Sequence, residues 1–551
     1  MVATRTFLFT AIVQLVLAVP SPATLTDRPS SFDSTTCELI QPIWYRSHPS
    51  LSTIRQRVTD SVKSLWPSSR SQAPENTRHA TTFRADQLVL RFNITTDVDA
   101  QAISEAANTL FLDVWDQSED RVDIRLANDD VSLLLGLSPS HLRNSHTALY
   151  TGDELARAIH RSYPSSTSIP FELSYRQRAT THSDRITRRP NSDVFFDEYR
   201  SLSVIVPWMR LLQSLFSSHV SILSIGSSYE GRDIPALRVG VHPTNNANPN
   251  GKRKTILITG GLHAREWVST STVNYVAYSL ITSYGRRKSI TRLLEEFDFV
   301  FVPTLNPDGY EYTWTTDRLF RKNRQPTSLR FCRGLDLDRT YPYMWDGNVT
   351  GSADNPCSEG YAGSEPLEAV ETRAMIDWAR NETLSNNVDF VGLLDLHSYS
   401  QQILFPYSYS CDVTPSNFED LAEMASGLAK AIRTRDHENY RTLSACGTDV
   451  TLSTRRAGNA AGGSLLDWFY LEMHIHHAFQ VKLRDKGSYG FLLPSSEIVP
   501  TGIEMTKAVE HFGRLLGQKY GAAGFDTDWE EDDVPVVRSQ DRMFAKQNPL
   551  Q

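Results

Sequence analysis

The chain has 551 residues, of which 40% are hydrophobic and 10% aromatic, and this composition excludes a fibrous, low-complexity or wholly disordered protein. Its length corresponds to about three to four domain equivalents. The 56 Lys and Arg residues against 64 Asp and Glu residues give a net charge of −8, which lacks the basic footprint of a dedicated nucleic-acid binder. Beyond the N-terminal segment no run of about 18 apolar residues occurs, so we expect no membrane span.

Residues 1–22 have the pattern of a secretory signal peptide. Arg5 precedes an apolar stretch, Phe7–Val19, that is too short to span a bilayer and is followed by small residues and prolines. We expect cleavage near Ala18–Ala23; the alternative is a buried N-terminal strand or an anchor. The segment predicts entry into the secretory pathway.

An oxidising compartment makes the five cysteines candidate disulfide partners, with Cys411 and Cys446 a plausible pair and the partner of Cys37 left open. Three sequons are candidate glycosylation sites in the same compartment: Asn93, Asn348 and Asn381.

Composition divides the remaining chain into five parts. Residues 23–82 are rich in Ser, Thr, Pro and Arg and predict a pro-segment of low order. Residues 83–175 predict a small α+β unit, and residues 176–192 an exposed, arginine-dense linker with sites for proteolytic processing. Residues 193–521 form a regular core domain. Residues 522–551 predict a solvated tail, because six of the eight residues 526–533 are acidic.

The small α+β unit is predicted from alternating strand and helix patterns. In chain order we expect a strand at Phe83–Phe92, a helix at Asp99–Phe111, a strand at Val122–Leu126 and a helix at Asp153–Ser162.

In the core domain short apolar runs alternate with longer amphipathic segments. The expected elements are a helix at Glu198–Phe216, a strand at Thr255–Thr259, a helix at Ser269–Ser283, strands at Phe297–Val302 and Phe390–Leu396 with a helix between them at Leu367–Arg380, a helix at Asn417–Ile432, a strand at Ala478–Leu483 and a helix at Thr501–Gly517. Ser416 is a candidate cap, and Thr501 with Glu504 forms a capping-box pattern. The alternation predicts an α/β fold, a mixed central β-sheet with helices on both faces, whose sites lie at the carboxyl ends of strands.

Polar side chains with the chemistry of metal ligands follow two of these strands. His263 and Glu266, three residues apart after Thr255–Thr259, can face one point, and His397 ends the strand Phe390–Leu396. Two imidazoles and one carboxylate are the ligands of an open zinc site with a vacant position. Asp336 is a plausible carboxylate to fix the tautomer of a ligand imidazole. An HxxE pair by itself is more often structural; the second histidine at a strand end favours the metal site.

Seven blocks of this sequence resemble, in order and spacing, the zinc carboxypeptidases of the A/B type from about Glu198 to Phe512. They are GGLHAREW, LNPDGYEYTWTTDRLFRKNR, CRGLDLDR, NPCSEGYAG, DLHSYSQQILFPYSY, GGSLLDW and KLRDKGSYGFLLPSSEIVPTGIE. The resemblance implies the zinc carboxypeptidase fold and, more loosely, an activation-type pro-domain before it.

The resemblance also implies roles for individual residues. His263, Glu266 and His397 would bind one Zn²⁺, and Cys332 and Cys357 would form a disulfide. The positions that contact substrate in that family also keep their residue types. Arg265 would contact the substrate, Arg321 would polarise the scissile carbonyl and Arg339 would hold the terminal carboxylate. Ser398 and Tyr399 are at neighbouring substrate positions.

Three positions depart from the active members of that family. The glutamate that serves as general base is Lys482 here, the asparagine that precedes the carboxylate-binding arginine is Asp338, and the mobile tyrosine is Gly458. Hydrolysis needs a base to take a proton from the attacking water, and a positioned base contributes about 10²–10⁴-fold. A protonated Lys482 has no lone pair for that proton, and its charge disfavours a nearby cation.

Asp338 places a negative charge beside Arg339 and weakens the site for a substrate carboxylate. It could instead form a buried salt bridge with Arg339 or Arg321, or pair directly with Lys482. We therefore predict a zinc-binding pseudoenzyme, secreted or vacuolar, that resembles inactive fungal carboxypeptidase-like proteins linked to cell-wall organisation. The alternatives are an active zinc carboxypeptidase of altered mechanism or specificity, and a protein whose arginine-lined cleft binds a peptide or an anionic ligand. The sequence predicts no oligomeric state.

Overall fold

The structure is a computed structural model that describes residues 86–118, 120–164, 194–241, 251–345, 355–447, 460–522 and 524–525. All of them belong to one compact unit, residues 57–551. The predictions for the signal peptide, the pro-segment, the processing linker and almost all of the acidic tail lie outside the described residues.

The first described part is a four-stranded antiparallel sheet with helices, here called the N-terminal unit (residues 86–164), in the strand order β2-β3-β1-β4. Its elements are β1 (Gln87–Asn93), α2 (Asp97–Thr109), β2 (Asp113–Gln117), β3 (Arg121–Ala127), α3 (Val131–Leu137), β4 (His146–Tyr150) and α4 (Gly152–Ser162). Phe92, Ile103 and Ile124 belong to its own buried core. The expected small α+β unit before the main fold is confirmed.

The second part is built on a mixed sheet of eight strands in the order β11-β10-β12-β9-β7-β8-β6-β5. The strands are β5 (Val220–Ser227), β6 (Asp233–Val239), β7 (Arg253–Thr259), β8 (Asp298–Val302), β9 (Val388–Ser398), β10 (Gln402–Phe405), β11 (Arg441–Ser444) and β12 (Ala478–Leu483). The central strands β12, β9, β7 and β8 are parallel, whereas β10 runs antiparallel to β12, and β6 runs antiparallel to β8. The predicted mixed sheet is thus confirmed.

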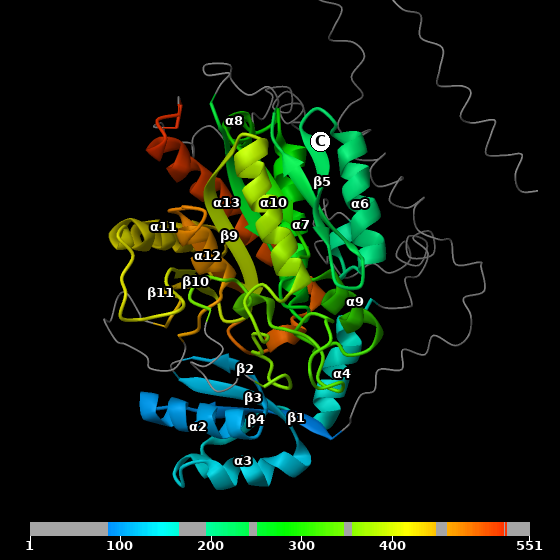
Figure 1. Ribbon diagram of the computed structural model, residues 1–551, viewed down its shortest axis with the longest axis vertical. Coiled ribbons are helices and arrows are strands. Elements are labelled where there is room, and N and C mark those ends of the chain that lie inside the picture. The colour runs from blue at the N-terminus through cyan, green and yellow to red at the C-terminus, as the bar shows by residue number, and fades with distance from the viewer. Residues whose placement is uncertain are drawn as a thin grey trace, which may run out of the picture. The chain divides into compact units, whose positions relative to one another are not determined.

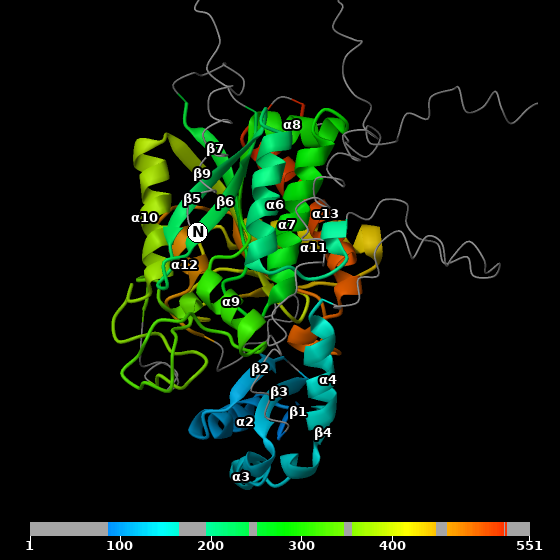
Figure 2. The same ribbon diagram turned by 90° about the vertical axis from the view of Figure 1, so that its right-hand side faces the viewer.

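Helices cover both faces of this sheet, as predicted. They are α6 (Leu202–Leu215), α7 (Trp267–Ser283), α8 (Lys288–Glu296), α9 (Pro307–Thr315), α10 (Val370–Ser385), α11 (Phe418–Asp436), α12 (Leu465–Leu471) and α13 (Ile498–Lys519). Figure 1 shows α10 in front of the strands, and Figure 2 shows the strands between α10 on one side and α7 and α13 on the other. Among the described helices none is both long and apolar enough to cross a membrane.

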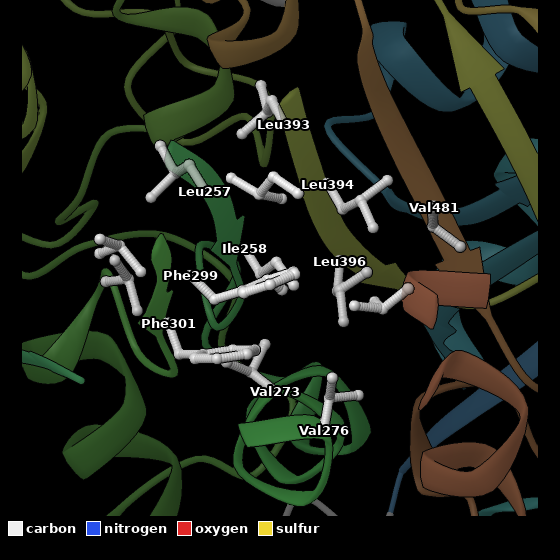
Figure 3. Packing of buried hydrophobic residues seen from close by; sticks show 14 of the residues in the cluster. Leu257, Ile258, Val273, Val276, Phe299, Phe301, Leu393, Leu394, Leu396 and Val481 are labelled. Carbon is white, nitrogen blue, oxygen red and sulfur yellow. The ribbon is translucent and has the colours of Figure 1, made fainter. Parts of the chain in front are cut away.

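Continuous apolar runs form the middle of the sheet because both of its faces are covered. All five residues of β8 are buried. Figure 3 shows Ile258, Phe299 and Phe301 from β7 and β8 packed near side chains of α7. This rigid core fixes where β7 and β9 end, and their carboxyl ends lie at the same edge of the sheet because the two strands are parallel.

Several predicted helix starts differ from the structure, among them that of α10, which was expected at Leu367 and lies at Val370. The helix expected from Glu198 begins at Leu202, and α11 has Asn417 rather than Ser416 at its N-cap. Thr501 and Glu504 form no capping box, because α13 begins earlier, at Ile498. Instead, the Thr501 hydroxyl donates to the Glu497 carbonyl at 2.6 Å.

Candidate metal centre

Three buried side chains from the ends of β7 and β9 converge on one point. His263 and Glu266 lie in the turn between β7 and α7, and His397 lies one residue before the end of β9. His263 Nδ1 is 3.0 Å from one Glu266 oxygen, and His397 Nδ1 is 3.1 Å from the other. The candidate ligand atoms all lie within 4.8 Å of one another, so the group could hold a metal ion.

A carboxylate stands behind each imidazole. His263 Nε2 lies 2.9 Å from Asp336 Oδ1, and His397 Nε2 lies 2.8 Å from Asp395 Oδ2. Because a carboxylate only accepts, both rings carry their proton on Nε2. The two Nδ1 atoms lie 3.1 Å apart and each also faces an oxygen of Glu266, so this group of acceptors needs a proton or a cation at its centre. The donor set therefore fits a zinc ion held by two nitrogens and one carboxylate.

The histidines and carboxylates of this group stabilise each other's charged forms. Burial by itself raises the pKa of Glu266, but the imidazoles of His263 and His397 outweigh it and lower that pKa. Burial lowers the pKa of His397, but Asp395 and Glu266 outweigh it and hold that pKa well above its usual range. A proton on His397 therefore competes with a cation, and cation binding weakens as the pH falls.

Asp336 contacts both a candidate metal ligand, His263, and the cleft arginine Arg321. Its Oδ2 accepts from Arg321 Nη2 at 2.9 Å, while its Oδ1, besides meeting His263, accepts the backbone N–H of Asp338 at 3.1 Å. Burial favours its neutral form, but Arg321 and His263 hold the pKa of Asp336 well below its usual range. Asp336 thus has the position that the sequence predicts for a carboxylate behind a ligand.

Asp338 is occupied by groups of its own surroundings. Its carboxylate lies 3.5 Å from Arg339 Nη1 and accepts from the backbone N–H of Leu465 at 3.0 Å and from Gln480 Nε2 at 3.2 Å. The pairing with Arg339 is one of the alternatives that the sequence left open. Within the described residues no ion pair joins Asp338 to Arg321 or Lys482.

Lys482 lies beside the metal group. It is half-buried in β12, paired in register with His397 of the parallel strand β9. Together with His263, Glu266 and His397 it lines a cavity of about 360 Å³. Gly458, the third departure, and the sequon at Asn348 lie outside the described residues.

The N-terminal unit supplies part of the wall of that cavity, through residues of α2 and β2 such as Asn108, Trp115 and Asp116. Three predicted substrate positions lie in or beside this interface. Arg265 is 1% exposed and binds both carboxylate oxygens of Asp113 of β2, at 2.7 and 3.0 Å.

Tyr399 is the second of these positions, and its hydroxyl donates to Asp123 of β3 at 2.9 Å. Ser398 is the third, and its backbone N–H donates to Glu266 at 3.1 Å.

Sequence reasoning missed Asp395 and the acidic residues of β2 and β3. The first had a usable signal: Asp395 and His397 are two apart in one strand, so their side chains share a face. No local pattern marks Asp113 or Asp123, because Arg265 and Tyr399, with which they bond, lie far away in the chain.

Two disulfides brace loops of the larger part. Cys332 is bonded to Cys357, as the resemblance implies, and Cys411 to Cys446, the pair that the sequence left plausible. Such bonds are typical of proteins from oxidising compartments. The sequon residues Asn93 and Asn381 are both exposed.

Known proteins share both the sequence and the architecture of this chain. The family model described as "Zinc carboxypeptidase" matches residues 205–508. The protein named "Inactive metallocarboxypeptidase ECM14" of Uncinocarpus reesii is 50% identical over 553 residues, which cover 96% of this chain and 92% of that protein. The protein of the same name from Arthroderma gypseum is 49% identical over 529 residues, 88% of each chain.

Among solved structures, thrombin activatable fibrinolysis inhibitor has a TM-score of 0.62 at 28% identity, with 79% of this chain and 99% of that one covered. Carboxypeptidase A from Helicoverpa armigera has a TM-score of 0.63 at 21% identity, covering 79% of this chain and 98% of that chain, a likeness of fold. By the family match and the two close relatives, this chain belongs to the zinc carboxypeptidase family.

Proposed function

We propose that this protein binds one zinc ion in a carboxypeptidase fold and does not cleave peptides. The observation that carries the proposal is the lining of this cavity: a buried His263–Glu266–His397 group lies beside Lys482, which is the residue of β12 in register with His397. The relatives of about 50% identity are named inactive metallocarboxypeptidases, which agrees with it.

Zinc, when bound, would polarise a carbonyl oxygen and make a coordinated water more acidic. This chain would have to supply the base that receives the proton of the attacking water. An ammonium group at position 482 has no lone pair for that proton, and its positive charge opposes the cation instead of offsetting it. The loss of a positioned base alone is about 10²–10⁴ in rate.

Recognition of a free C-terminus is weakened as well. The carboxylate of Asp338 lies 3.5 Å from Arg339, so a substrate carboxylate would have to displace it or share the guanidinium with it. Arg321 already pairs with Asp336. These internal pairs also oppose the alternative of an anionic ligand, since each arginine meets a carboxylate of the chain itself.

The cellular compartment and the biological role are proposed from the sequence and from the relatives, not from the geometry of the cleft. The signal-like N-terminus and two disulfides favour a secreted or vacuolar protein. The resemblance to fungal inactive members extends the proposal to cell-wall organisation and biogenesis. A peptide held without cleavage is the ligand class that the fold favours.

Metal analysis combined with a peptidase assay tests the proposal. Purified protein should contain about one zinc ion per chain, and the His397→Ala variant should lose most of it. Neither protein should shorten members of a diverse peptide library. Absence of zinc from the wild-type protein would refute the metal assignment, whereas zinc-dependent trimming that His397→Ala abolishes would establish the active-enzyme alternative.

A further inference from the structure

Helix α8 and the turn before it carry an excess of positive charge. Residues 284–297 contain four cationic and two acidic side chains. The acidic Glu296 binds Lys254 of β7 at 2.7 Å, and the cationic Arg287 binds both oxygens of Glu510 of α13 at 2.6 and 2.9 Å. The other three cations of this stretch, here called the α8 patch, are Arg286, Lys288 and Arg292.

The neighbouring carboxylates do not offset this excess. Glu510 is shared with Lys507, which contacts it at 2.9 Å, and Glu295 is the second acidic side chain of residues 284–297. Within the described residues, this stretch and its ion-pair partners named above comprise six cations and three carboxylates. Arg286 and Lys288 also lie at the N-terminal end of α8, whose first turn has no acidic residue. Since the helix dipole disfavours cations at that end, a carboxylate is favoured beside them.

The described part of the chain ends beside the α8 patch. Phe525 is 2% exposed, its ring lies 6.2 Å from that of Phe297, and its carbonyl accepts from Gln518 Nε2 at 2.9 Å. The carbonyl of Gly524 accepts from Arg292 Nη1 at 3.3 Å. The residue that follows Phe525 in the sequence therefore starts next to the patch.

The segment that follows has the complementary charge. Six of the eight residues 526–533 are acidic. Eight extended residues span up to about 26–29 Å, whereas Lys288 and Arg292 are separated by about 6 Å along the axis of α8. From its attachment at Phe525 the acidic segment is long enough to cover the whole patch.

We propose that residues 526–533 fold back onto the α8 patch and bind it through several ion pairs. The segment of the same chain is favoured over a second copy, because a short tether keeps its local concentration high. The docked segment holds Phe525 in place between α8 and α13.

The patch lies far from the metal group along the strands. Helix α8 ends directly before β8 begins, and β8 is parallel to β7, whose carboxyl end leads to His263. Both ribbon views show α8 at the end of the strands away from α9, which follows the carboxyl end of β8 (Figures 1 and 2). The docked segment is therefore independent of zinc binding and of peptide cleavage.

Zero-length cross-linking of the full chain tests this contact. A carbodiimide joins Lys288 Nζ to a carboxylate in contact with it, and mass spectrometry identifies the joined peptides. An equimolar mixture of unlabelled and ¹⁵N-labelled chains distinguishes links within one chain from links between two chains. We expect Lys288 to be linked to residues 526–533 of the same chain, at a rate that falls as salt is added, because salt screens exposed charges.

Charge variants separate docking from mere proximity of the segment. Arg286→Gln with Arg292→Gln removes two cations of the patch and leaves Lys288 as the reporter. Arg286→Lys with Arg292→Lys keeps both charges. Lys430→Gln with Arg433→Gln removes two exposed cations of α11 and is the control of equal net charge.

At the salt concentration that halves the wild-type rate, the first double variant should react about threefold more slowly, because two exposed ion pairs together change a binding equilibrium about fivefold. The charge-keeping variant and the α11 control should react at the wild-type rate. Thermal unfolding verifies that all variants fold. The proposal is overturned if Lys288 forms no link to the segment, if the link joins two chains, or if the first double variant reacts as fast as the α11 control.

Discussion

The orientation of each candidate ligand imidazole depends on one carboxylate. Asp395 accepts from His397 Nε2 on one oxygen and from the Thr259 hydroxyl, at 2.6 Å, on the other. Asp336 does the same for His263 with the help of Arg321. Removing one such partner leaves the ligand in place but frees its ring to rotate and exchange tautomers.

The Asp395→Asn substitution should therefore weaken zinc binding without abolishing the fold. We expect the zinc dissociation constant, measured by competition with a chelator, to rise about 10–100-fold. Asp389→Asn is the matched control, because Asp389 lies in the same strand with its side chain exposed. Equal affinity in Asp395→Asn and wild type would show that this carboxylate does not tune the site.

Replacing Lys482 tests whether the protein is inactive only because the general base is missing, or also because it binds a substrate carboxylate poorly. Lys482→Glu alone should recover far less than the 10²–10⁴-fold that a base contributes, because Asp338 still opposes a substrate carboxylate at Arg339. Adding Asp338→Asn should increase kcat/KM for C-terminal trimming further. Recovery by Lys482→Glu to the level of the double variant would show that Asp338 matters less than its geometry indicates.

At the scale of elements, the sequence predicts well where local pattern and burial agree. Strand β12 begins and ends at the predicted residues, since its apolar run is short and bounded. The start of α13 was misplaced because Thr501 and Glu504 imitate a capping box, while Glu504 is in fact buried and binds Arg484. Short strands such as β2 and β10 escaped prediction because their pairing partners, not their own periodicity, make them strands.

Close packing between α7 and α13 gives a prediction at this scale. A Cβ atom at Gly502 would overlap Cγ of Tyr275 and lie 2.8 Å from its Cβ, an atom that is fixed to the backbone of α7. Gly502→Ala should reduce the free energy of unfolding by about 1–3 kcal/mol in chemical denaturation. Gly136→Ala, in an open position of α3, should be neutral or slightly stabilising. Unchanged stability in Gly502→Ala would contradict this packing.

For the molecule as a whole, the fold and the metal group were predictable because motif order fixes the chain's path and strand ends bring His263 and His397 together. The contribution of the N-terminal unit to the cleft was not predictable from the sequence. Pairs such as Asp113–Arg265, 152 residues apart, depend on how two sheets pack.

Global stability should depend on pH through His511 of α13. Burial, with Arg514 and Lys430, lowers the pKa of His511 to about 4 from an ordinary value of 6.5. The unfolded chain therefore takes up a proton between pH 6.5 and 4 that the folded chain refuses, so this contribution to stability is present above that window and lost as the pH falls through it. Denaturation at pH 7.0 and 4.5 should show a smaller acid loss for His511→Gln than for wild type. An identical acid loss in both would contradict this.

The central claim is that the protein binds zinc but does not cleave peptides. A single-turnover assay tests it most directly. Zinc-loaded protein is mixed in excess with one peptide that carries a label on its C-terminal residue. The N-terminal unit is first cut from the larger part and removed, so that access to the cleft is not the limit. We predict that zinc remains bound at about one ion per chain and that the label stays on the peptide for hours. Zinc-dependent release of the label at rates near those of a working carboxypeptidase would contradict an inactive site built around Lys482.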